Sequence, residues 1–205
     1  MRSFPFIIGG LAALVAVLVA RHTGLASATT TSATWLPATK FRSGRREAPS
    51  LVVLHSTNGP VGWTARQVAE MWAGAGSPAT SSHYVVGPNE VFQSVREDDE
   101  AWCAGTQGNR RGIHIELLGR SWATDWLGDG RPVLERAARL AAQIARRWGI
   151  PVERRTVDDL KAGRAGFTTH AALTTAFGES THDDPGGFGD VRWPWTEFLA
   201  MVREA

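Results

Sequence analysis

Hydrophobic side chains after residue 50 follow two different periods. Residues 51–55 form a short apolar run that predicts a buried strand, and in residues 113–118 every second side chain shares a face, which predicts another strand. Residues 64–72 and 132–148 carry apolar side chains three or four positions apart, the spacing of an amphipathic helix. Gly149 follows the longer of these helices and is expected to end it.

A hairpin is predicted between residues 82–87 and 91–96, because the intervening Pro-Asn-Glu sequence favours a turn. A last amphipathic helix is expected over residues 195–202. Strands that alternate with helices indicate an α/β domain, and a hairpin adds at least one antiparallel pair to its sheet. We therefore expect residues 50–205 to form one α/β domain with a mixed sheet.

The first 28 residues differ from the rest of the chain. Arg2 gives a positive start, residues 4–20 carry no charge, and Ala26-Ser27-Ala28 has the small-residue pattern that signal peptidase accepts. We favour a signal peptide cleaved after Ala28. An uncleaved membrane anchor is the alternative, although the apolar run is slightly short for a hydrocarbon layer of about 30 Å. Both interpretations place the functional part outside the cytoplasm, secreted or in the cell envelope.

Composition and charge narrow the function further. Residues 29–49 are rich in Ala, Thr, Ser and Arg without apolar periodicity, which predicts a flexible linker. The chain has 205 residues, of which 43% are hydrophobic, enough for one substantial core. Acidic and basic side chains balance over residues 29–205 and no basic stripe stands out, so nucleic acid is not expected as a partner. Cys103 is the only cysteine, which excludes an intramolecular disulfide, and we expect it to be a buried apolar residue.

Two histidines and an aspartate are candidates for a metal site. His55 ends the first predicted strand, His170 lies in a polar, loop-like context, and Asp184 precedes a Pro-Gly turn. Two imidazoles and one carboxylate, with a fourth position left to water, form the ligand set of a catalytic zinc. The spacing of these residues matches no compact local motif, so the residues alone leave the metal site open.

Several segments, taken in order, carry a resemblance to a known family. They are LVVLHST, SSHYVVG, AWCAG followed by GIHIELLGR, TTHAAL leading to DDPGG, and WPW. This series resembles the zinc-dependent N-acetylmuramoyl-L-alanine amidases, a family shared by bacteriophage lysozyme-amidases, the muropeptide-recycling amidase and peptidoglycan recognition proteins. The resemblance implies a central mixed sheet flanked by helices, one zinc ion, and cleavage of the amide between the lactyl group of N-acetylmuramic acid and L-alanine.

The resemblance also implies roles for individual residues. His55, His170 and Asp184 correspond to the zinc ligands, with Asp183 as the neighbouring alternative to Asp184. Glu116 corresponds to a glutamate that faces the zinc-bound water, and it would act as general base. Without the resemblance, Glu116 could equally be a solvated residue on an edge strand.

Three positions depart from the family pattern. Ser82 stands where members that lack the glutamate carry a tyrosine. His182 stands where many members have lysine or threonine; it could donate to the oxyanion, bind the metal, or be an exposed loop residue. Cys103 stands where many members have histidine. We expect His83 and His114 to be structural, although His114 shares a strand face with Glu116. Four tryptophans in predicted loops are candidates for contacts with sugar rings, namely Trp102, Trp122, Trp126 and Trp193.

These observations predict an exported, monomeric zinc amidase that acts on peptidoglycan. Contact with a membrane is expected only through an uncleaved N-terminal segment. Two alternatives remain open: a peptidoglycan-binding module without turnover, and a zinc peptidase that cuts within the stem peptide.

Overall fold

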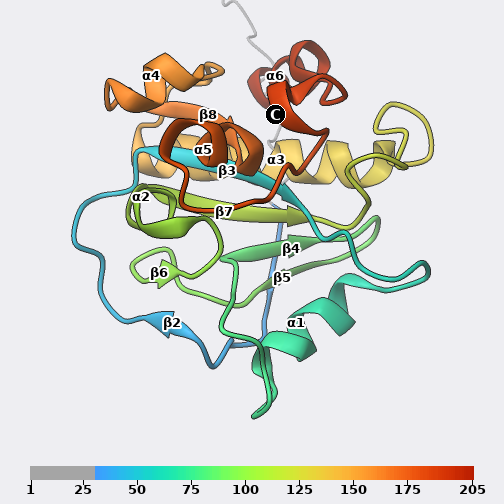
Figure 1. The fold of residues 1–205 in the computed structure, drawn as a ribbon. Helices are drawn as coiled ribbons and strands as arrows, with labels where there is room; N and C mark the ends of the chain where they lie inside the picture. The colour runs from blue at the N-terminus through green and yellow to red at the C-terminus, as the bar shows by residue number, and fades with distance from the viewer. Residues whose placement is uncertain (1–30) are drawn as a thin grey trace, which may run out of the picture.

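The computed structural model describes residues 31–205, so the predicted export segment, residues 1–28, lies outside the described residues. A six-stranded sheet forms the centre of the molecule, with the strand order β1-β5-β4-β7-β3-β8 (Figure 1). Its strands are β1 (Thr34–Trp35), β3 (Leu51–Ser56), β4 (Tyr84–Val86), β5 (Val91–Gln93), β7 (Gly112–Leu117) and β8 (Gly166–Thr169). The β4–β5 hairpin is antiparallel and the other pairs are parallel, which confirms the predicted mixed sheet.

The helices are α1 (Ala65–Ala73), α2 (Gly105–Arg111), α3 (Arg131–Trp148), α4 (Val157–Lys161), α5 (His170–Phe177), the 3-10 turn η1 (Phe188–Asp190) and α6 (Trp195–Glu204). Both longer helices predicted in the middle of the chain are confirmed. Thr64 caps α1 by accepting the backbone N–H of Gln67, and Gly149 ends α3 in the left-handed conformation at φ 66°. Within residues 31–205, no helix has both the length and the apolar character needed to cross a membrane.

Alternation along the central strands divides the core into two sides. Val52 and Leu54 of β3 lie in the large cluster that packs against α3 and α6. Leu51 and Val53 point to the opposite side, where they pack against residues of α4 and α5. Val85 of β4 also points to that side and packs against α1. Two separate clusters therefore cover the second face of the sheet, and the carboxyl ends of β3 and β7 lie between them.

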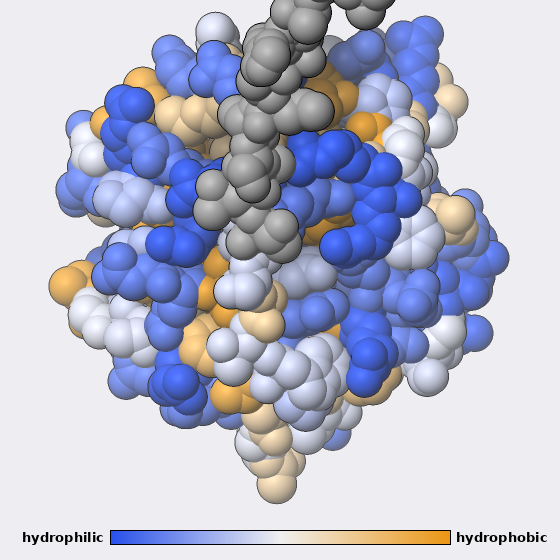
Figure 2. All heavy atoms as spheres, turned by 180° about the vertical axis from the view of Figure 1, so that it is seen from behind, coloured by the Kyte–Doolittle hydropathy of each residue, from blue (hydrophilic) through white to orange (hydrophobic). Residues whose placement is uncertain are grey.

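Helix α3 covers the first face and turns its arginines outward. Seen from behind, hydrophilic residues predominate on the molecule and the hydrophobic ones are scattered among them (Figure 2). No extended apolar patch is visible there among the described residues that this view exposes.

The segment over residues 34–45, which follows the predicted export segment in the sequence, is packed on the domain. β1 pairs in parallel with β5, and β2 (Phe41–Arg42) pairs antiparallel with β6 (Glu100–Ala101). The guanidinium of Arg45 donates to the backbone carbonyls of Arg110 and Gly112. A flexible linker over residues 29–49 was therefore the wrong expectation for residues 34–45. Strands of two residues are too short to produce a period in the sequence, and edge pairing satisfies their backbone groups.

Candidate metal centre

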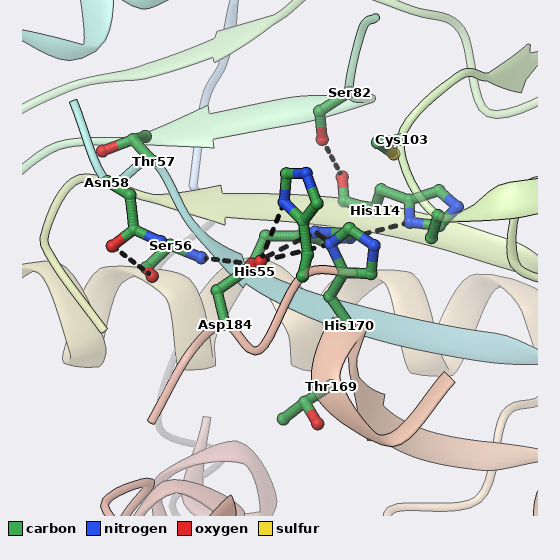
Figure 3. Close-up of polar contacts among 12 residues, drawn as sticks. His55, Ser56, Thr57, Asn58, Ser82, Cys103, His114, Thr169, His170 and Asp184 are labelled. Atoms are coloured by element: carbon green, nitrogen blue, oxygen red, sulfur yellow. Dashed lines mark hydrogen bonds and ion pairs between the residues drawn. The ribbon is translucent and has the colours of Figure 1, made fainter. Parts of the chain in front are cut away.

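Three side chains from distant parts of the chain converge between the two clusters on the second face of the sheet (Figure 3). His55 comes from β3, His170 from the first residue of α5, and Asp184 from the loop after α5. The Nδ1 atoms of His55 and His170 are 3.2 Å apart. Asp184 Oδ2 lies 3.5 Å from His55 Nδ1, and Asp184 Oδ1 lies 3.2 Å from His170 Nδ1. All three residues are buried.

The parallel sheet explains how residues so far apart in sequence meet. β3 and β8 are parallel neighbours, so their carboxyl ends lie at the same edge, and His170 follows the last residue of β8. Thr169 caps α5 by accepting the backbone N–H of Ala172. His170 was expected in a loop, and the structure corrects this by placing it at the start of α5. Asp184 is held by the backbone N–H of Ser56, which donates to Oδ2 over 3.0 Å.

The spacing of the three groups fits a zinc ion. With bonds of about 2.0–2.1 Å in a tetrahedral site, neighbouring ligand atoms stand roughly 3.4 Å apart. The Nδ1–Nδ1 separation of 3.2 Å between His55 and His170 agrees with that value. Each nitrogen also has one of the two oxygens of Asp184 at 3.2–3.5 Å, Oδ2 for His55 and Oδ1 for His170. Burial lowers the pKa of His55 to about 4, so its ring is neutral and able to bind a metal at neutral pH. Burial would raise the pKa of Asp184, but hydrogen bonds with His170 and His182 outweigh it and hold the pKa well below the ordinary value.

Asp183, the alternative acidic ligand, is turned elsewhere. Its Oδ2 accepts a hydrogen bond of 2.9 Å from the indole N–H of Trp122. The structure therefore brings Asp184, and not Asp183, to the two histidines.

Glu116 lies beside the ligand cluster on the central strand β7, directly opposite His55 in the strand register. It is not on an edge strand, which removes the alternative of a solvated edge residue. Its Oε2 is buried and has no hydrogen-bond partner. Burial, followed by the charge of Asp184, raises the pKa of Glu116 well above its usual range. An unpaired carboxyl group with a raised pKa is typical of a residue that exchanges protons.

His182 occupies the open side of the cluster. Its ring stacks on His170 with centroids 4.8 Å apart, and its Nδ1 lies 3.5 Å from Asp184 Oδ1. The hydrogen bond to Asp184 raises the pKa of His182. The side chain is 65% exposed, so it is both at the surface and next to the cluster.

The other departures from the family pattern have different surroundings. The Ser82 hydroxyl donates to the backbone carbonyl of His114 over 3.0 Å, which joins the segment before β4 to β7 (Figure 3). The carbonyl of Tyr84 lies 3.2 Å from the same oxygen and shares its single proton. Cys103 was expected to be buried, and the structure places it half-buried in the wall of the cavity that Glu116 also lines. Desolvation raises the pKa of its thiol well above the ordinary value. A protonated thiol is a poor nucleophile, in agreement with the expectation of an apolar role.

A cavity of about 210 Å³ opens in front of the cluster. Glu116, His170 and Asp184 line this cavity together with apolar side chains of α1, including Val68 and Trp72. Two of the tryptophans considered for sugar contacts, Trp126 and Trp193, are buried in the large core cluster, so that expectation is wrong for them. Trp102 and Trp122 are partly exposed. A side chain in a loop can also pack into the core, so loop position alone did not distinguish the buried tryptophans from the exposed ones.

The sequence profile described as N-acetylmuramoyl-L-alanine amidase matches residues 45–187. The chain belongs to the N-acetylmuramoyl-L-alanine amidase family. This match spans more than half of the chain and includes the candidate metal ligands, Glu116 and His182. A comparison with curated protein sequences finds no significant match.

Solved structures of similar fold agree with the family assignment. The Staphylococcus aureus hydrolase AmiA, solved with its ligand, has a TM-score of 0.65 at 17% identity, over 85% of this chain and 86% of that one. A mutant endolysin from Bacillus subtilis has a TM-score of 0.59 at 19% identity, over 84% and 99% of the two chains. The N-acetylmuramoyl-L-alanine amidase LysC from Clostridium intestinale has a TM-score of 0.55 at 14% identity, over 85% and 99%. At these identities the likeness shows the fold, and the amidase fold predicted from the sequence is confirmed.

Proposed function

We propose that this family member is an exported zinc-dependent amidase that cleaves peptidoglycan between the lactyl group of N-acetylmuramic acid and L-alanine. The observation that carries the proposal is the meeting of His55, His170 and Asp184 at zinc-ligand spacing, with the unpartnered Glu116 beside them in one cavity. A binding module would gain nothing from a buried carboxyl group without a partner, since such a group costs stability. The family assignment supports the amide bond over a cut within the stem peptide.

His55, His170 and Asp184 would hold the zinc ion. When bound, zinc supplies Lewis-acid polarisation of the amide carbonyl and lowers the pKa of a bound water molecule from 15.7 to about 7. The chain contributes the rigid placement of these ligands. Ser56 holds one oxygen of Asp184, and burial keeps His55 neutral.

Glu116 is the proposed general base. Its Oε2 takes a proton from the attacking water and later delivers it to the departing amine nitrogen, which leaves as a neutral amine. Placement next to His55 in the strand register brings this carboxylate to the ligand cluster. The absence of a hydrogen-bond partner at Oε2 leaves that oxygen free for both transfers.

His182 is the proposed donor to the oxyanion. The hydrogen bond to Asp184 engages Nδ1 and favours the protonated ring, which leaves Nε2–H available to a developing negative charge. A single donor of this kind is worth roughly 10²- to 10³-fold in rate. Its exposed position at the mouth of the cavity allows it to meet substrate without moving the metal ligands.

The proposed location follows from the substrate. Peptidoglycan lies outside the cytoplasm, and the apolar segment at residues 4–20 with its Ala-Ser-Ala sequence would direct export. We propose that the domain acts as a monomer and that only an uncleaved N-terminal segment would tie it to a membrane.

Mass spectrometry of digested peptidoglycan tests the proposed reaction. The wild type should release intact stem peptides that begin with L-alanine, and a chelator should stop this release. Glu116→Gln should lose the activity while it still binds zinc, whereas Glu197→Gln, an exposed glutamate on α6, should behave as wild type. Cuts between amino acids would indicate a peptidase, and retention on peptidoglycan without products would indicate a binding module.

A further inference from the structure

A second histidine lies directly behind His55, on the side away from the ligand cluster. The Nε2 of His55 is 3.0 Å from the Nδ1 of His114 (Figure 3). On the far side of its own ring, the Nε2 of His114 is 3.1 Å from the backbone carbonyl oxygen of Gly108 in α2. Both rings are buried. These contacts form a chain from a backbone carbonyl through two imidazoles to the proposed metal position.

The direction of the hydrogen bonds along this chain is fixed at its far end. A carbonyl oxygen can only accept, so the Nε2 of His114 must carry the proton that reaches Gly108. The Nδ1 of neutral His114 is then an acceptor, and the Nε2–H of His55 must be the donor to it. A neutral His55 with its proton on Nε2 presents a lone pair at Nδ1. That is the atom that lies 3.2 Å from His170 and 3.5 Å from Asp184.

The surroundings of His114 are shaped to keep this chain intact. A Cβ atom on Gly112 would lie 2.7 Å from the Nε2 of His114 and 2.8 Å from the carbonyl oxygen of Gly108. Any side chain at Gly112 would therefore collide with both partners of the hydrogen bond. The ring of His83 stacks on His114 with centroids 5.5 Å apart and an interplanar angle of 14°. The stacked ring of His83 fixes one face of His114, and the missing side chain at Gly112 leaves room for the hydrogen bond to Gly108. Together these two features favour one orientation of the His114 ring.

His170 lacks an equivalent constraint. Its Nε2 lies 3.0 Å from the hydroxyl oxygen of Ser180, and a hydroxyl group can donate or accept. The proton of His170 can therefore sit on either nitrogen. With its proton on Nδ1, His170 donates to the lone pair of His55. With its proton on Nε2, His170 donates to Ser180 and presents a lone pair at Nδ1 to a cation, and the ring is neutral in both forms.

We propose that His114 is a positioning residue that holds His55 in the Nε2-protonated tautomer, so that Nδ1 faces the metal before the metal binds. The inference rests on the proposed zinc site and extends it to a residue that touches neither metal nor substrate. Groups that orient a ligating histidine in this way are worth about 10- to 100-fold in metal affinity.

The tautomer can be measured directly in the full chain by long-range proton–nitrogen NMR of labelled histidines at neutral pH, before and after zinc is added. We expect His55 to carry its proton on Nε2 in both states, whereas His170 changes its Nδ1 signal when zinc binds. A metal-free His55 with the proton on Nδ1 would overturn the proposal. This readout needs no variant, so it decides the question even if substitutions at position 114 impair folding.

Zinc affinity, measured by competition with a chelator, gives the second test. His114→Leu keeps the bulk but removes the acceptor, and it should weaken zinc binding about 10- to 100-fold. His114→Asn offers an oxygen near the former Nδ1 and should recover much of that loss. Ile113→Ala, a deletion on the opposite face of the same strand, should lower stability and leave zinc affinity unchanged.

A folded His114→Leu protein with wild-type zinc affinity would contradict the proposal, as would equal losses in His114→Leu and Ile113→Ala. Neither readout uses peptidoglycan. A failure to cleave peptidoglycan would therefore overturn the proposed function alone and leave the role of His114 standing.

Discussion

Replacement of Glu116 by glutamine should move stability and activity in opposite directions. The amide has nearly the same size as the carboxyl group, so the cavity wall stays in place. In the metal-free protein, burial and the neighbouring Asp184 disfavour the charged form of Glu116, which raises its pKa well above 4.5. The variant removes a charge that the folded protein tolerates poorly, and it also removes the proposed general base.

The size of the stability effect follows from the raised pKa of Glu116. A carboxyl group whose pKa is raised on folding destabilises the protein once the pH exceeds its unfolded value, here 4.5, and the cost grows until the pH passes the folded pKa. Each tenfold increase in the proton affinity of the folded carboxylate costs about 1.4 kcal/mol at high pH. For a domain of this size, 1 kcal/mol corresponds to roughly 2–4 °C in Tm. Metal-free Glu116→Gln should therefore melt at least a few degrees above wild type at pH 8 and at about the same temperature at pH 4.

Activity should fall by about 10²- to 10⁴-fold in the same variant, because that is the usual contribution of a positioned general base. The assays are thermal unfolding after chelation at both pH values, and release of stem peptides by the zinc-loaded enzyme. Glu197→Gln on the exposed side of α6 is the matched control and should change neither quantity. A Glu116→Gln enzyme with near wild-type turnover would refute the base assignment. A metal-free Glu116→Gln protein that is less stable than wild type at pH 8 would refute the conclusion that Glu116 is buried without a hydrogen-bond partner.

Three further predictions test the ligands, the core and the buried histidines. Asp184→Asn should weaken zinc binding by more than about 100-fold, which exceeds the loss typical of a residue that only orients a metal ligand. Asp183→Asn should bind zinc as wild type does. If equilibrium dialysis found the same loss of zinc affinity in both variants, the choice of Asp184 would be contradicted. Leu134→Ala, on the buried face of α3, should lower the free energy of unfolding by about 2–5 kcal/mol in a urea titration. The turnover of the folded enzyme should stay unchanged. A free energy of unfolding within about 1 kcal/mol of wild type would contradict the packing of α3. Burial, followed by the charge of Arg45, lowers the pKa of His83 to about 3. The free energy of unfolding should therefore fall as the pH drops from about 6.5 towards 3, because only the unfolded chain takes up the proton in this range. His83→Asn should show a smaller fall, and a pH profile identical to that of the wild type would contradict burial of a neutral ring at this position.

Strong periodicity made the main elements predictable from the sequence. α1, α3, α6, the β4–β5 hairpin and the strands β3 and β7 were all expected close to their observed bounds. The elements that were missed are short. β8 has four residues, β1, β2 and β6 have two each, and such lengths leave no measurable period. Helix α5 escaped because its residues are buried on several sides, so its sequence shows little amphipathic contrast.

The site was predictable in composition but not in arrangement. His55, His170 and Asp184 were indicated by a resemblance carried by several motifs, whereas their spacing alone left a metal site open. The separation of 115 residues between the histidines is bridged by the parallel pairing of β3 with β8, which no local pattern reveals. His114 was expected to be a structural residue, and its contact with His55 was not foreseen. The orientation of its ring depends on a backbone carbonyl of α2, whose position cannot be read from the sequence.

Crystals of the full chain grown with zinc, with anomalous diffraction recorded on both sides of the zinc absorption edge, test the central claim most directly. The account predicts one strong peak at bonding distance from His55 Nδ1, His170 Nδ1 and a carboxylate oxygen of Asp184, with Glu116 close by and outside bonding distance. A peak held by other residues, or no zinc peak at these three side chains, would contradict it.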